Sequence, residues 1–348
     1  MLSFTVNATT FHVGLSGRQI LFTIVNIAAV LQDWRWVADS GKLSAHHWHF
    51  ESALPRNFIE RRFPFIDLGR LRSAFATRRL NPDIVFSHGP WITLYTAFIL
   101  SGRKKQIRHI AMSFNFTDLP SGKLLWAMRR FFPKVERFVV FSQMERVLYS
   151  ELFNIPIDRF DFIHWGVNPP INRALPVKYV QPYLVALGGE ARDYDTIIEA
   201  ARLRPNDRFV IIARPHSVKG ELPSNVSLRI NVTFDEAWST VWHAYASLIS
   251  LRSAATPNGH VTLVGSMLLG KAIVITDSTG VHDYVSSNQS ALLVPAASPK
   301  DFANAIAHLL EDRQLGLRLG QNARHFAEMH CTEGSVINYI EQVLVIQR

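Results

Sequence analysis

Residues 256–277 read TPNGHVTLVGSMLLGKAIVITD, and this stretch decides the fold class. A loop with Gly259 leads into an apolar helix expected over 260–269, and a β-branched strand follows over 272–276. The first amides of such a helix are unpaired and carry partial positive charge, so the loop is a candidate anion site. The alternative, a glycine that only starts a packed helix, stays open on the sequence alone.

Strands and helices alternate on both sides of this stretch. Towards the C-terminus of the chain we expect strands over 183–187, 209–213, 247–251 and 292–294, and helices over 195–203 and 301–310. Towards the N-terminus we expect strands over 2–8, 34–38, 84–86, 107–112, 137–141 and 160–165, and helices over 20–31, 91–100 and 144–153. Such alternation predicts an α/β fold with parallel sheets covered by helices on both faces.

The length of 348 residues fits two domains. Residues 168–182 contain four prolines, which is typical of a linker. We therefore expect an N-terminal domain over 1–168, a second domain over 169–330, and a C-terminal helix over 331–348 that packs back on the N-terminal domain. Two α/β domains joined in this way place a cleft at the carboxyl ends of both sheets, where ligands of such sheets bind.

Composition excludes several classes of protein. Apolar residues make up 48% and charged residues 19% of the chain, which excludes a disordered protein. Cys331 is the single cysteine, so an intrachain disulfide and a cysteine-rich zinc module are excluded. The histidines around Trp48 lack the acidic or cysteine partners of a metal site, and we expect a surface segment there.

The excess of positive charge is confined to the first half of the chain. Residues 1–170 hold 21 Lys and Arg against 12 Asp and Glu, whereas the remainder holds 16 of each kind. This asymmetry favours attraction to an anionic membrane surface or an acidic acceptor, although solvated helix faces explain any single basic cluster equally well. No motif of a nucleic-acid-binding protein accompanies the charge, so nucleic acid is not an expected partner.

The longest early apolar stretch, over 20–31, is shorter than a membrane-spanning helix, and no basic segment precedes an apolar core as in a secretion signal. We expect a cytoplasmic protein, peripheral at the inner face of the membrane.

Candidate binding residues follow the expected strands. Gly188 and Gly189 let the backbone approach a phosphate closely, and Arg192 supplies a guanidinium for it. Arg214 stands at the carboxyl end of another strand. For Arg192, a solvated or capping role on a surface helix is the competing interpretation.

Three further residues complete the candidates. His88 ends a buried strand and would face the cleft, with a structural histidine as the alternative. Asp283 and Tyr284 follow a glycine near the cleft and could hydrogen-bond a polar ligand, with a turn-stabilising aspartate as the alternative.

Residues 185–200, 259–284 and 291–295 resemble the donor-binding half of retaining GT-B glycosyltransferases, in particular family 4. The resemblance implies two Rossmann-like domains facing across a cleft, with the sugar nucleotide held by the second. It places Arg192 and Gly188 at the phosphates and His88 beside the donor sugar. Donor contacts are then expected from Gly188, Gly189, Arg192, Arg214, Asn258, Gly259, His260, Val261 and Thr262, and acceptor-side contacts from Gly14, Gly17, Asp283 and Tyr284.

The chain departs from the family pattern at three positions. Gly189 replaces the usual arginine, and the family's two acidic residues, which are separated by seven intervening residues, are missing at Gly265 and at 256 or 257. Asn258 and His260 are the candidates for replacing the lost hydrogen bonds.

The activity implied is transfer of a sugar from a nucleotide-diphosphate sugar to a lipid-linked or polysaccharide acceptor of the cell envelope, with retained configuration. Arg192 and His88 would carry it, without a metal or other cofactor. The alternatives are a sugar-nucleotide epimerase of the same fold and a non-catalytic sugar-nucleotide-binding module.

Overall fold

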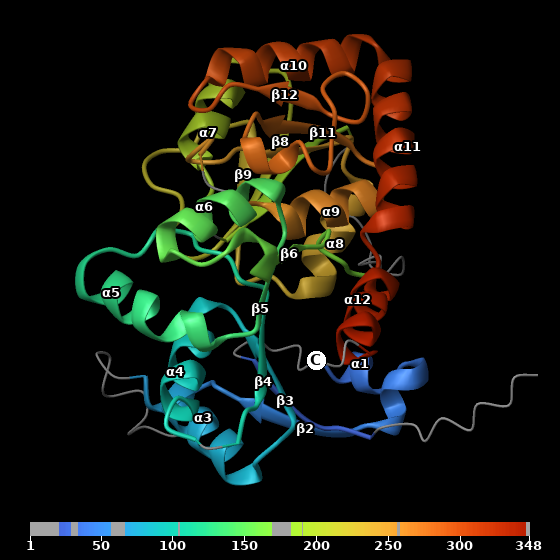
Figure 1. Ribbon diagram of the computed structural model, residues 1–348. Coiled ribbons are helices and arrows are strands. Elements are labelled where there is room, and N and C mark those ends of the chain that lie inside the picture. Colours follow the sequence, from blue (N-terminus) through green and yellow to red (C-terminus); the bar gives the residue numbers. More distant parts are fainter. Residues whose placement is uncertain are drawn as a thin grey trace, which may run out of the picture.

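The computed structural model describes residues 21–28, 34–56, 67–103, 105–168, 182–189, 191–255 and 258–345. These residues form two α/β domains, each built around its own six-stranded parallel sheet, as predicted (Figure 1). The expected strand over 2–8 and the turn with Gly14 and Gly17 lie outside the described residues.

The sheet of the N-terminal domain has the strand order β2-β1-β3-β4-β5-β6. Its strands are β1 (Thr23–Ala28), β2 (His47–Ser52), β3 (Ile84–His88), β4 (Arg108–Met112), β5 (Arg137–Val140) and β6 (Phe160–Phe162). Its helices are α1 (Arg35–Ala38), α3 (Leu68–Leu80), α4 (Pro90–Leu100), α5 (Gly122–Phe131) and α6 (Gln143–Phe153), with 3₁₀ turns η1 (Gly41–Ala45), η2 (Phe132–Lys134) and η3 (Ile157–Arg159).

The sheet of the C-terminal domain has the order β12-β11-β10-β7-β8-β9. Its strands are β7 (Leu184–Gly188), β8 (Phe209–Ala213), β9 (Val226–Ile230), β10 (Ala246–Ile249), β11 (Ala272–Thr276) and β12 (Leu292–Val294). Its helices are α7 (Tyr194–Leu203), α8 (Phe234–His243), α9 (His260–Leu268), α10 (Pro299–Glu311) and α11 (Arg313–His330), with the 3₁₀ turn η4 (Thr279–Val281); α12 (Glu333–Val345) follows.

The central strands are buried on both faces. Every residue of β3 and β11 is buried, because helices cover both sides of each sheet. The side chains of Ser142 and Asp193 accept hydrogen bonds from the backbone amides of Glu145 and Thr196. These caps start α6 and α7 just beyond β5 and β7, and so fix the loops at the carboxyl ends of the sheets.

Two expectations near the start of the chain are wrong. The helix expected over 20–31 is instead strand β1, whose β-branched residues lie between β2 and β3. Because this strand is buried on both faces, its continuous apolar run cannot be told from a buried helix by periodicity. The strand expected over 34–38 is the short helix α1; the rings of Trp34 and Trp36 stack at 5.3 Å and pack against the core instead of joining a sheet.

Helix α12 returns from the C-terminal domain to the N-terminal domain (Figure 1). Its residues Val336 and Ile340 share a hydrophobic cluster with Ile84 of β3. The Tyr339 hydroxyl donates a hydrogen bond to Asp161 Oδ2 at 2.7 Å. By these contacts the last helix belongs to the N-terminal core.

Candidate functional site

A cavity of about 760 Å³ lies between the domains, at the carboxyl ends of both sheets. The N-terminal domain contributes the ends of β3 and β5 and residues that follow β4, and the C-terminal domain contributes the ends of β7 and β8 and the first turn of α9. The expected residues that line this cavity are His88, Gly188, Gly189, Arg192, Arg214, Asn258, Gly259, His260, Val261 and Thr262. Residues from both halves of the chain therefore face one space.

His88, the last residue of β3, is 8% exposed. Its Nε2 donates a hydrogen bond to Asn26 Oδ1 on the neighbouring strand β1 at 2.8 Å, and the Trp34 ring lies 4.3 Å from the imidazole. Burial lowers the pKa of His88 to about 3, so the imidazole is neutral near pH 7. Nδ1 is then an acceptor, and it is buried with no partner among the described residues. His88, which lines the cavity, therefore carries an unsatisfied hydrogen-bond acceptor.

The Arg192 guanidinium lies against the loop after β7. Its Nη2 donates to Thr262 Oγ1 at 2.9 Å and its Nε donates to the Leu187 carbonyl at 3.3 Å. A Cβ at position 188 would lie within 3.0 Å of three guanidinium atoms, so glycine is required for this close approach. The guanidinium lines the cavity beside the first turn of α9.

Helix α9 presents its N-terminus to the same part of the cavity. Gly259 has φ 92°, a left-handed conformation that favours glycine, and ends the loop that precedes the helix. His260 is 5% exposed; burial lowers its pKa to about 4, and its Nε2 donates to the Gly280 carbonyl at 3.4 Å. The first turn of α9 therefore contributes positive potential through its backbone dipoles, next to the guanidinium of Arg192. The imidazole of His260 is neutral near pH 7 and adds no charge.

Arg214 and Gly189 form a second close contact on the cavity wall. A Cβ at position 189 would lie 2.5 Å from Arg214 Nε. The glycine that replaces the family's arginine thus makes room for a guanidinium that comes from the end of β8. Two guanidinium groups consequently flank the same glycine loop.

Trp238 of α8 packs directly on Gly265 of α9. A Cβ at position 265 would lie within 3.0 Å of three ring atoms of Trp238, which lines the cavity and is 5% exposed. The position at which the resembling family carries an acid is therefore filled by an aromatic ring from another helix.

Asp283 and Tyr284 lie at the contact between the domains and not among the residues that line the cavity. The backbone amide of Gln143 donates to Asp283 Oδ2 at 2.8 Å. The Tyr284 hydroxyl donates to the Phe141 carbonyl and accepts from the Trp165 amide, both at 2.8 Å. With these partners the two side chains hold the domains together. Gly14 and Gly17 lie outside the described residues.

Sequence reasoning did not single out Asn26, Trp34 or Trp238. A polar residue inside a β-branched run was the available signal for Asn26, but that run was interpreted as a helix. Trp238 is paired with Gly265 by tertiary packing alone, and the sequence holds no local signal of it. Among the described residues there is no group of three His, Cys, Asp or Glu that could hold a metal ion.

Two family models match the chain. The model for Glycosyltransferase Family 4 matches residues 34–170, and the model for Glycosyl transferases group 1 matches residues 190–326. No curated protein matches the chain.

Solved structures match it over nearly their whole length. Sucrose-phosphate synthase from Thermosynechococcus elongatus is 15% identical, with a TM-score of 0.71 and coverage of 92% of this chain and 98% of its own. Anabaena HepE in complex with UDP-glucose is 13% identical, with a TM-score of 0.67 and coverage of 93% and 99%. A trehalose-6-phosphate synthase, studied for glycosyl transfer with retention, has the same identity, TM-score and coverage as HepE.

The two facing domains and the matches together define a glycosyltransferase with the GT-B fold. Each domain is matched by its own family model, the N-terminal domain by Glycosyltransferase Family 4 and the C-terminal domain by Glycosyl transferases group 1. The chain therefore belongs to the GT4-like glycosyltransferases. In the part of the chain that the structure describes, no helix is long and apolar enough to cross a membrane.

Proposed function

We propose that the protein transfers a sugar from a nucleotide-diphosphate sugar to an acceptor, with retention of the anomeric configuration. One observation carries this proposal: Arg192 and the first turn of α9 converge beside the glycine loop, across one cavity from His88. A guanidinium, loop amides and a helix N-terminus are suited to a diphosphate. UDP-glucose bound to HepE and retention in the trehalose-6-phosphate synthase support the proposal by analogy.

In the proposed reaction the bond between the anomeric carbon and the phosphate oxygen breaks while the acceptor oxygen bonds to the same face of that carbon. The acceptor's proton passes to the leaving phosphate oxygen. No described residue that lines the cavity is Asp or Glu, which fits a route without an enzyme carboxylate. Arg192 and the α9 amides stabilise the departing diphosphate, and His88 Nδ1 accepts a hydrogen bond from a sugar hydroxyl. The proposal assigns no role to a metal or other cofactor.

Calorimetric titration with a panel of nucleotide sugars, followed by transfer assays, tests this proposal. We expect saturable binding of at least one nucleotide sugar, and release of its nucleoside diphosphate only when an acceptor glycan or glycolipid is added. Conversion of the donor without any acceptor would assign an epimerase. Binding without turnover would assign a sugar-nucleotide-binding module, and both results contradict transfer.

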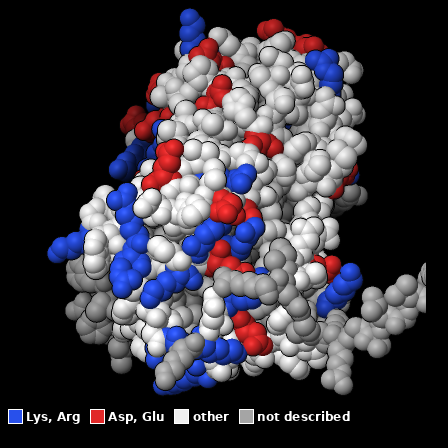
Figure 2. Space-filling model, in the orientation of Figure 1, with Lys and Arg blue, Asp and Glu red and all other residues white. Residues whose placement is uncertain are grey.

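We also propose that the acceptor is a lipid-linked or polysaccharide glycan, reached from the inner face of an anionic membrane. Figure 2 shows Lys and Arg gathered around α5 and over the N-terminal domain below it. Helix α5 carries Trp126, which is 68% exposed, beside Arg129 and Arg130, while Met128 is buried beneath them. An exposed aromatic ring next to basic side chains fits the interface between lipid head groups and acyl chains.

Co-sedimentation with vesicles measures this membrane contact. Wild-type protein should bind vesicles that contain phosphatidylglycerol and should lose this binding as salt is added. It should not bind vesicles of pure phosphatidylcholine. Each basic residue near the surface contributes about 1 kcal/mol, so W126A/R130A should bind at least about fivefold more weakly. L317A/R318A, an exposed apolar and basic pair on α11, is the matched control and should bind like wild type. Equal binding to both kinds of vesicle would reject the contact.

A further inference from the structure

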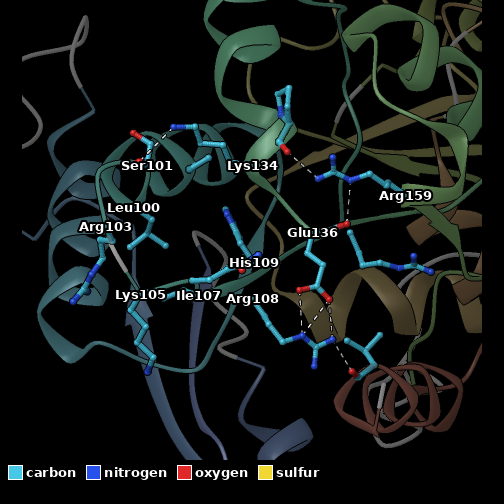
Figure 3. A pocket seen from close by; sticks show the side chains of 15 residues that line it. Leu100, Ser101, Arg103, Lys105, Ile107, Arg108, His109, Lys134, Glu136 and Arg159 are labelled. Carbon is cyan, nitrogen blue, oxygen red and sulfur yellow. Dashed lines mark hydrogen bonds and ion pairs between the residues drawn. The ribbon is translucent and has the colours of Figure 1, made fainter. Parts of the chain in front are cut away.

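A second cavity, of about 860 Å³, lies in the N-terminal domain (Figure 3). It lies at the amino ends of the strands, whereas the cleft lies at their carboxyl ends. Arg108 and Arg137, the first residues of β4 and β5, line it. Ser113, just beyond the other end of β4, lines the cleft instead. The two cavities are thus separated by the length of a five-residue strand, roughly 16 Å.

The lining of this second cavity, the basic hollow, is dominated by cations. Glu136 is the acidic side chain among its described lining residues. The basic side chains that line it are Arg103, Lys105, Arg108, Lys134, Arg137 and Arg159.

Acidic partners neutralise part of this charge. Arg108 pairs with Glu136 at 2.9 Å, Arg137 with Asp161 at 2.7 Å, and Lys105 with Asp83 at 2.9 Å. These ion pairs tie together the starts of the strands and leave an excess of positive charge in the hollow.

Arg103 and Lys134 contribute to that excess. Arg103 Nη1 donates to the Arg78 carbonyl, and Lys134 Nζ donates to the Ser101 carbonyl at 3.4 Å. Neither has an acidic partner among the described residues, and a carbonyl dipole does not cancel a formal charge. In Figure 3 they lie on either side of Leu100 and Ser101. Main-chain carbonyls therefore hold two uncompensated cations near each other.

Arg159 completes the wall. Its Nε donates to the Glu136 carbonyl at 3.3 Å and its Nη2 to the Pro133 carbonyl at 3.1 Å. The hollow is thus lined by guanidinium and ammonium groups from several segments. Hydrogen bonds to main-chain carbonyls hold these groups in place. Such a constellation matches an anion with several charged oxygens, because Arg and Lys bind phosphate through charge-assisted hydrogen bonds.

We propose that the basic hollow binds an anion that carries two or more phosphate groups, at a site separate from the cleft. The volume of the hollow exceeds the needs of a single phosphate, and the cations reach it from the loop before β4, from η2 and from η3. The phosphates can belong to a soluble oligophosphate or to a phosphorylated lipid head group. The site does not depend on the activity proposed for the cleft.

Inorganic tripolyphosphate is the probe, titrated by calorimetry at physiological ionic strength. Because the cleft also suits phosphates, the titration uses the R192A/R214A protein, in which both guanidinium groups of the cleft are absent. We expect one tripolyphosphate to bind this protein, and R103A/K134A in the same background to bind at least about tenfold more weakly. K300A/R318A, two exposed cations of the C-terminal domain, removes equal charge and should leave the affinity unchanged.

Amide hydrogen exchange locates the site. Tripolyphosphate should slow exchange at the amides of residues 100–103, 105–108 and 134–137, which border the hollow. Unchanged affinity in R103A/K134A, no binding, or protection confined to the loops after β7 and before α9 would overturn the proposal.

Displacement separates the two sources of phosphate. Vesicles that contain phosphatidic acid would displace bound tripolyphosphate if the hollow receives a lipid head group, and would leave it bound if the ligand is soluble. Both results support a phosphate site. Failure of every nucleotide sugar to bind would contradict the cleft proposal and leave this one standing.

Discussion

Gly265→Ala is expected to lower the free energy of unfolding by about 1–3 kcal/mol, although alanine is the better helix former. The added methyl group would lie within 3.0 Å of three atoms of the Trp238 ring. That ring is buried and belongs to a hydrophobic cluster with Val185 and Val241, so it cannot shift without disturbing α8 and the neighbouring sheet. Urea unfolding followed by circular dichroism measures the change.

The sign of the effect should reverse once the ring is removed. In a Trp238→Ala background, Gly265→Ala should raise the free energy of unfolding by up to about 1 kcal/mol, since the helix propensity of alanine then prevails. Gly316→Ala is the matched control, because a Cβ at position 316 in α11 meets nothing closer than 3.7 Å. That substitution should stabilise the wild-type protein. Equal stability of the wild-type and Gly265→Ala proteins would show that no such packing constraint exists.

The alternation of strands and helices predicted the α/β class of the C-terminal domain and five of its six strands, whereas β9, α8 and α11 were not predicted. β8, β11 and β12 begin and end at the expected residues, because each is a short apolar run bounded by turn residues. β1 is also a mostly apolar strand and was missed, because the apolar run over 20–31 that contains it has the length of a helix. Length and apolarity cannot decide between these structures when both faces of a strand are covered.

Some residues of the cavity could be predicted from local sequence motifs, whereas others come together only through tertiary packing. Glycine loops followed by helices identified Gly188, Arg192 and Gly259, because strand, turn and helix are adjacent in the chain. Asn26 and His88 form a hydrogen bond between neighbouring strands that lie far apart in the sequence. Trp238 contacts Gly265 because α8 packs on α9. Such contacts follow from the topology, and a single sequence gives no separate signal of them.

Arg192→Ala is expected to give the largest loss of activity. The substitution removes the charge beside the glycine loop together with the hydrogen bonds to Thr262 and to the Leu187 carbonyl. Loss of one charge-assisted contact costs about 1.5–3 kcal/mol, and loss of a group that stabilises developing charge lowers kcat by up to about 10³-fold. We expect kcat/KM for the nucleotide sugar to fall between about tenfold and 10³-fold.

Two comparisons assign that loss to the guanidinium. Arg192→Lys keeps the charge and loses the planar fork, so its kcat/KM should lie between those of the wild-type and Arg192→Ala proteins. Arg202→Ala removes an exposed arginine of α7 that pairs with Glu199 at 3.1 Å, and it should leave kcat/KM unchanged. Because the contact is to the diphosphate, the affinity for the free nucleoside diphosphate should fall as well. Unchanged kinetics in Arg192→Ala would remove the guanidinium from the site and leave the amides of α9 as the diphosphate-binding group.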